Sequence, residues 1–185
     1  MVVLVLYEIR ISAGTIFRRA GLDAQDAAHD LLNRISGARV ISQVNFENWD
    51  VDHVVVSRDG VLVIETKWTG KSNIENVRDF PDLAKALDQA RESARKIRLL
   101  LSDADFRQPI DVEPAVLLMG IALPEVPGGV TRIDDVLILI GHQSWQWATL
   151  FQTRRLDSWM VHAIAGGLEE RKRLMAASAN AAAEQ

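Results

Sequence analysis

Two short runs rich in β-branched residues, 51–57 and 61–67, are separated by the tripeptide Arg-Asp-Gly. Such runs favour strands, and Asp-Gly between them favours a tight hairpin because it tolerates a positive φ. Charged or titratable residues nevertheless stand where the first strand begins and the second ends: Asp50, Asp52, His53, Glu65 and Lys67. Burying charge costs free energy, so the open end of this hairpin requires an explanation.

Composition sets wide limits. The chain has 185 residues, 48% hydrophobic and 25% charged, which is typical of one globular domain. Cysteine is absent, which excludes disulfides and thiolate metal sites. Its apolar runs are too short to span a bilayer and it lacks a signal-peptide pattern, so we expect a cytoplasmic protein without a membrane partner. The net charge of −4 argues against coating nucleic acid by bulk electrostatics, but it leaves room for a local basic face.

Periodicity and turn signals predict an α/β protein with a central mixed sheet, in which the hairpin is part of a β-meander flanked by helices. Residues 81–101 are typical of a helix, with Pro81 in the first turn and an apolar stripe through Leu87 and Ala94. We expect one domain over residues 1–185. The other predicted elements are strands at 2–11, 38–47, 114–123 and 135–141, helices at 23–35, 142–151 and 154–177, and a frayed tail at 178–185.

The charged end of the hairpin has two interpretations. Side chains alternate along a strand, and a turn at 58–60 places Asp52 opposite Glu65 or Thr66. If the register brings their faces together, Asp52, Glu65 and Lys67 converge, and two carboxylates make a site for Mg²⁺ that could activate water and stabilise phosphoryl charge. Alternatively, the charges simply meet water at strand ends, with Glu65 and Lys67 in an ion pair of little energy.

The combination of Asp52-His53, the turn glycine Gly60 and Glu65-x-Lys67 closely resembles the core of the nuclease-related domain (NERD), a branch of the PD-(D/E)XK superfamily. In that family a helix precedes the first strand, and a helix containing glutamine follows Glu-x-Lys. Gln89 resembles that glutamine. Two later strands followed by helices also agree, so the resemblance covers about residues 20–155.

The resemblance implies a restriction-endonuclease-like core and a divalent-metal-dependent deoxyribonuclease, acting as an endonuclease or nickase on DNA. Asp52 and Glu65 would bind Mg²⁺ or Mn²⁺, and the backbone carbonyl of Thr66 would complete the protein ligands. Lys67 would orient or activate the attacking water, and Gln89 would support the site or the phosphate.

Two departures from the family pattern stand out. Val51, and not proline, precedes Asp52, as in many relatives. The first helix, which usually carries a glycine-glutamate pair, reads GLDAQDAAHD, where Gln25 is nearest the glutamate position and Asp26 is next to it. Either residue could stand at the metal. If Gln25 does, an acidic ligand is lost, which favours the alternative of a weak or inactive module that binds nucleic acid or a separately encoded protein partner.

Other residues have a functional and a structural interpretation. His53 should point to the opposite face from Asp52 and act as a structural hydrogen-bonding group. Trp49 and Trp68 flank the charged end and could stack on bases or pack in the core. A homodimer could form by pairing of the strand at 2–11 across subunits. The cations that could meet DNA phosphates, or else form solvated helix faces, are Lys71, Arg91, Arg95 and Lys96.

Overall fold

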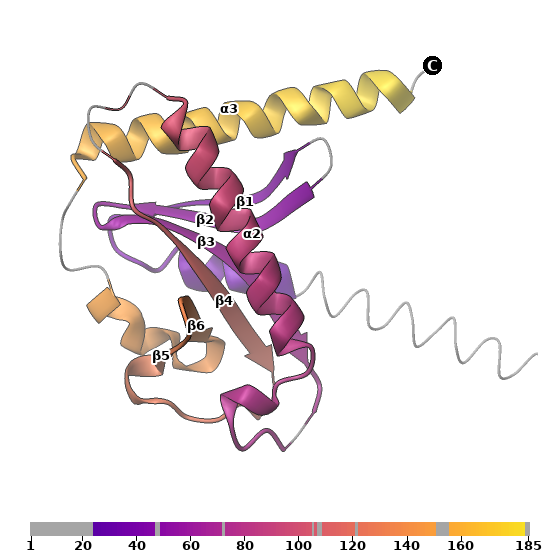
Figure 1. The fold of residues 1–185 in the computed structure, drawn as a ribbon, viewed down its shortest axis with the longest axis vertical. Helices are drawn as coiled ribbons and strands as arrows, with labels where there is room; N and C mark the ends of the chain where they lie inside the picture. Colours follow the sequence, from indigo (N-terminus) through magenta and orange to yellow (C-terminus); the bar gives the residue numbers. More distant parts are fainter. Residues whose placement is uncertain are drawn as a thin grey trace, which may run out of the picture.

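The fold is built around one central β-sheet. The computed structural model describes residues 24–46, 49–71, 73–104, 106, 109–120, 122–150 and 156–183. Within these residues, six strands form one sheet in the order β1-β2-β3-β4-β6-β5 (Figure 1). Their bounds are β1 Arg39–Phe46, β2 Trp49–Ser57, β3 Gly60–Thr69, β4 Val112–Gly120, β5 Val130–Ile133 and β6 Val136–Ile140.

The strand directions explain why a helix lies between β3 and β4 in the chain. The strands β1, β2 and β3 form an antiparallel meander, while β4 and β6 run parallel to β3 and β5 is an antiparallel edge. A parallel neighbour requires a crossover, and the helix α2 (Leu83–Ser102), preceded by the 3₁₀ helix η1 (Val77–Asp79), supplies it between β3 and β4. Its buried stripe packs on these strands: Leu83, Ala86, Leu87, Ala90, Ala94, Ile97 and Leu101.

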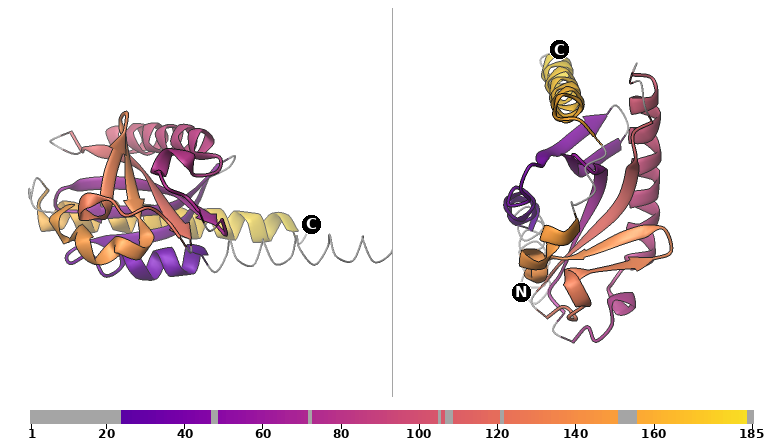
Figure 2. Two further views of the ribbon diagram at one scale, coloured as in Figure 1. Left: turned by 90° about the horizontal axis from the view of Figure 1, so that it is seen from below. Right: turned by 90° about the vertical axis from the view of Figure 1, so that its left-hand side faces the viewer.

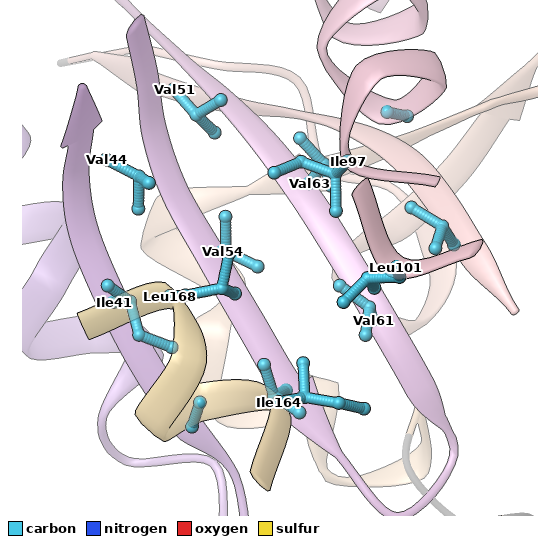
Figure 3. Packing of buried hydrophobic residues seen from close by; sticks show 14 of the residues in the cluster. Ile41, Val44, Val51, Val54, Val61, Val63, Ile97, Leu101, Ile164 and Leu168 are labelled. Atoms are coloured by element: carbon cyan, nitrogen blue, oxygen red, sulfur yellow. The ribbon is translucent and has the colours of Figure 1, made fainter. Parts of the chain in front are cut away.

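Helices cover both faces of the sheet (Figure 2). One face packs against α2 and the long helix α3 (Ser158–Ala183), in a cluster that includes Val54, Val63, Ile97 and Ile164 (Figure 3). The opposite face packs against residues 24–32, which are helical, and against the 3₁₀ segment η3 (Gly141–Leu150). None of the described helices is long and apolar enough to cross a membrane.

The predicted α/β class and mixed sheet are confirmed, and the architecture is consistent with a restriction-endonuclease-like core. The main differences from the predicted elements are in the second half of the chain. Residues 141–150 form η3 and not an α-helix, with a kink at Gln143. The C-terminal helix begins at Ser158 and continues to Ala183 through the predicted tail, where alanines favour helix. The strand β5, and the short 3₁₀ helix η2 (Pro127–Gly129) before it, were not predicted. The strand predicted at 2–11 lies outside the described residues.

The hairpin turn depends on Gly60. Its φ is +140°, and a Cβ there would lie 2.9 Å from the carbonyl oxygen of Asp111, a group that already accepts a hydrogen bond from the Val61 amide at 2.9 Å. The turn glycine therefore brings the hairpin against the segment that leads into β4, in addition to closing the turn.

We expect Gly60→Ala to lower the free energy of unfolding by about 1–3 kcal/mol, because the substitution combines an unfavourable φ with a clash against backbone. Urea unfolding of wild type and variant measures the change. Gly37→Ala is the matched control, since Gly37 has a φ of +76° but a Cβ there meets nothing within 4 Å. Equal losses for the two variants would show that close approach to Asp111 has no energetic role.

Candidate active site

The strands β2 and β3 separate before either of them ends. Their backbones pair from the turn as far as His53 and Ile64. Beyond that point β2 remains paired with β1, and β3 remains paired with β4. The sheet thus opens between its second and third strands. We call this opening the fork, and its arms are residues 49–52 of β2 and 65–69 of β3.

Asp52 stands at the base of the fork and bridges it with its side chain. Its Oδ2 accepts a hydrogen bond of 2.8 Å from the backbone N–H of Thr66. The N–H and C=O of one strand residue point to the same edge of the strand, so the Thr66 carbonyl is directed toward the fork as well. The Thr66 hydroxyl is buried and has no hydrogen-bond partner among the described residues.

A change in side-chain alternation occurs at the same place. Val51 and Val54 lie three residues apart, yet both belong to the cluster under α2 and α3 (Figure 3). Opposite Asp52 on β1, Gln43 has a φ of +54°, in the left-handed region that is uncommon for a residue other than glycine. Strict alternation, which groups Asp52 with Val54, therefore fails across this part of the hairpin.

Glu65 and Lys67 occupy the other arm of the fork. They form an ion pair in which Lys67 Nζ lies 2.7 Å from Glu65 Oε1, and their side chains are 27% exposed for Lys67 and 12% for Glu65. They share a strand face with Val63, which packs beneath α2 and α3. The register predicted from the turn is confirmed as far as the pair of His53 and Ile64, and one further step of the same register would set Asp52 opposite Glu65.

The electrostatics of the fork favour a cation. The pKa of Asp52 is raised from its ordinary 3.8 to about 6, mainly by burial and then by the nearby charge of Glu65, while the Thr66 N–H and Lys67 act in the lowering direction. A divalent ion would relieve this repulsion, and the available donors are oxygens, which suit Mg²⁺ or Mn²⁺. The described residues contain no cluster of three or more His, Cys, Asp or Glu side chains that could hold an ion. Any ion here would therefore rely on two carboxylates and neutral oxygens.

The helix of residues 24–32 brings Gln25, and not Asp26, to the fork. Gln25 Nε2 donates a hydrogen bond of 3.1 Å to Asp52 Oδ1, whereas the Asp26 side chain is exposed. Of the two alternatives from the sequence, the position closest to Asp52 is thus held by a neutral amide.

His53 belongs to a chain of hydrogen bonds beside the fork. Asn33 Nδ2 lies 2.7 Å from His29 Nε2, His29 Nδ1 lies 2.6 Å from Ser42 Oγ, and Ser42 Oγ lies 2.8 Å from His53 Nδ1. Burial, with a smaller contribution from His29, lowers the pKa of His53 to about 4. The imidazole is therefore neutral near pH 7.

This chain confirms that His53 is a hydrogen-bonding residue, but the expectation that His53 and Asp52 point to opposite faces is wrong, because Asp52 departs from the alternation. Both Asp52 and His53 are linked to side chains of the helix 24–32, Asp52 directly and His53 through Ser42. The roles of His29 and Ser42 were not predicted, because residues in separate elements carry no spacing signal for each other.

The remaining sequence candidates lie around the fork without entering it. Gln89 is exposed on α2, and no hydrogen bond joins it to the fork within the described part of the chain. One and two turns further along, Ser93 and Lys96 are half-buried on the same flank of α2, and Lys96 Nζ lies 4.7 Å from the ring centre of Trp49. This flank therefore faces β2. Trp49 itself stacks on Phe46 at 3.7 Å, as a packing residue would.

The predicted phosphate contacts on α2 have carboxylate partners within the protein. Arg91 pairs with three aspartates, Asp88, Asp134 and Asp135. Glu92 pairs with both Arg95 and Lys96. Lys71 is exposed at the end of β3, and Trp68 is 37% exposed. These arginines fit the solvated-face interpretation better than the phosphate interpretation.

Comparison with known proteins gives a family match. The model of the nuclease-related domain, NERD, matches residues 20–119, which is more than half of the chain. The match ends near the end of β4, short of the boundary at 155 expected from the sequence, and it includes every fork residue together with Gln25 and Gln89. No curated protein and no solved structure matches the chain.

The raised pKa of Asp52 leads to a pH-dependent prediction. Since the folded pKa is above the ordinary value, the stabilising contribution of Asp52 is complete below about pH 3.8 and is lost as the pH rises through about 6. In metal-free buffer, the stability of Asp52→Asn relative to wild type should therefore increase by about 1–3 kcal/mol between pH 4 and pH 6 and then level off.

Urea unfolding at several pH values in the presence of a chelator measures this difference. Asp79→Asn removes an exposed carboxylate that does not contribute to the pKa of Asp52 and serves as the control. A stability difference between Asp52→Asn and wild type that stays constant over this pH range would contradict the prediction.

Proposed function

The chain belongs to the nuclease-related domain family, and on this premise we propose that it is a Mg²⁺- or Mn²⁺-dependent deoxyribonuclease, an endonuclease or nickase that hydrolyses phosphodiester bonds of DNA. The observation that carries the proposal is the fork. It brings Asp52, Glu65, Lys67 and the edge of β3 at Thr66 to one opening in the sheet. Within a nuclease-related domain, that opening is the best candidate for the reaction site.

In this proposal each fork residue has one role. The carboxylates of Asp52 and Glu65 and the carbonyl of Thr66 would hold the metal, which when bound would supply charge stabilisation at the phosphate and a more acidic water. Lys67 would orient or activate the attacking water and add positive charge near the phosphate. Gln89 supports the phosphate from α2.

The ion pair between Glu65 and Lys67 supports these roles. It keeps the ammonium beside the carboxylate, with Nζ at 2.7 Å from Oε1 and both side chains mostly buried. A lysine held in this way is positioned before DNA arrives and loses little freedom in the reaction. The cytoplasm is the proposed location.

We expect purified protein to nick or cut supercoiled plasmid with Mg²⁺ or Mn²⁺, and Glu65→Ala and Lys67→Ala to lower the rate by about 100-fold or more, because each removes a group that acts on the transition state. Gel analysis of plasmid and of linear single- and double-stranded DNA measures the rates. Glu75→Ala and Lys85→Ala remove the same charges from exposed positions and should leave cleavage unchanged. Failure of the wild type to cut any DNA form with either metal would refute the proposal.

One observation favours a second candidate function. Because Gln25 stands beside Asp52, the fork has two carboxylates where a glutamate at this position would give three. A weaker metal site is consistent with a nuclease-like module that binds nucleic acid, or a separately encoded protein partner, with little catalysis. Homodimerisation through the strand predicted at 2–11 stays a prediction.

Gln25→Glu tests which candidate applies. A third carboxylate at the fork should tighten Mn²⁺ binding by about tenfold or more, because ligand charge sets the affinity of such sites. Calorimetry or electron paramagnetic resonance measures Mn²⁺ affinity independently of cleavage. Asp26→Ala is the control and should not alter affinity. If Asp26→Ala weakens binding and Gln25→Glu has no effect, the metal position belongs to Asp26.

A further inference from the structure

A pocket of about 530 Å³ lies at the closed end of the hairpin, away from the fork. Three segments line it: the end of the helix 24–32 and the turn after it, the hairpin turn at 57–59, and η3. The helix links the two sites, because Gln25 contacts Asp52 from its first described turn, while Leu31 in its last turn and Arg34 just beyond it line the pocket. The pocket is therefore separate from the proposed reaction site.

The lining combines one large exposed ring with two cations. Trp145 is 78% exposed, although a tryptophan usually hides most of its surface. The exposed Arg34 has no ion-pair or side-chain hydrogen-bond partner among the described residues. Arg58 donates from Nε to the carbonyl of Leu156 at 3.3 Å, which holds the side chain, and its terminal nitrogens have no partner among the residues that the structure describes.

The other residues that line the pocket are apolar or small and polar. Leu31 and Ile35 provide apolar walls, and Ser36 and Ser144 provide hydroxyl groups. Asp59 is the one carboxylate among the described lining residues, against two arginines. The pocket thus offers a flat ring for stacking, guanidinium groups for an anion and small polar groups between them.

We propose that this pocket binds a nucleotide, with the base stacked on Trp145 and the phosphate held by Arg34 and Arg58. Base stacking on an exposed aromatic ring and guanidinium contacts to phosphate are the two interactions that such a ligand requires. The volume is in the range of small-ligand pockets. The same chemistry is offered by a free nucleotide and by one unit of single-stranded DNA, and the inference does not depend on the proposed nuclease activity.

Binding to the full chain in chelator-containing buffer tests the proposal without cleavage. Calorimetry would compare deoxyadenosine monophosphate, a short single-stranded oligodeoxyadenylate and inorganic phosphate. We expect the nucleotide or the oligonucleotide to bind far more tightly than phosphate, and Trp145→Ala to weaken that binding by roughly five- to 150-fold, which corresponds to the loss of one stacked base. Arg34→Ala should weaken nucleotide binding as well, and the affinity of this variant should depend less on salt concentration than the affinity of the wild type.

Matched controls decide between specific and general effects. Trp159→Ala removes a ring that is 59% exposed on α3, and Arg95→Ala removes an exposed arginine from α2. Neither should change binding, and circular dichroism checks that each variant folds. Binding of the monophosphate identifies a free nucleotide as the ligand, and binding of the oligonucleotide alone identifies a DNA strand.

Three outcomes would overturn the proposal: no binding of either nucleotide probe at millimolar concentration, phosphate binding as tight as nucleotide binding, or equal losses in Trp145→Ala and Trp159→Ala. The fork is tested separately, because Glu65→Ala should retain pocket binding. If the wild-type protein does not cleave DNA but still binds the nucleotide in the pocket, the result would count against the proposed nuclease and leave the pocket assignment standing.

Discussion

The hydrogen bond from the Thr66 amide to the Asp52 carboxylate determines how this sheet can open. Where β2 leaves β3, the inner edge of β3 loses its backbone partner, and an unpaired buried amide is costly. The side chain of Asp52 takes over that role. The same bond keeps a carboxylate partly buried next to Glu65, which is why its pKa is raised. The opening of the sheet and the charged cluster therefore have one structural cause.

Much of this arrangement could be predicted from the residues. The β-branched runs, the Asp-Gly turn and the spacing of Glu65 and Lys67 gave the hairpin and its register. The reversal of faces at Asp52 could not be predicted, because a glutamine at positive φ gives no signal comparable to glycine. The choice between Gln25 and Asp26 was also beyond the sequence, since neighbouring helical residues point about 100° apart and only packing fixes the rotation of the helix.

Charge patterning left two interpretations of the α2 cations open, a solvated face and a contact with phosphate. The arginines of α2 looked available for phosphate, but Arg91 and Arg95 are held by carboxylates of the same helix or of the turn between β5 and β6. Such pairs are worth little individually because they are exposed. Together they leave α2 without a free run of positive charge. The cation that pairs with a fork carboxylate is instead Lys67, which the strand pattern had already singled out.

The edge strand β1 of the described sheet is covered by a helix, α3, that is synthesised much later than the strand itself. The helix α3 packs along β1, and Lys172 Nζ donates to the carbonyl of Ser42 at 2.6 Å across a separation of 130 residues. An uncovered strand edge invites pairing with other chains. At about 5–20 residues per second, a ribosome needs roughly 7–26 s to add those residues. During each round of synthesis, β1 therefore spends that interval without the cover of α3, and its edge is open to pairing with other chains.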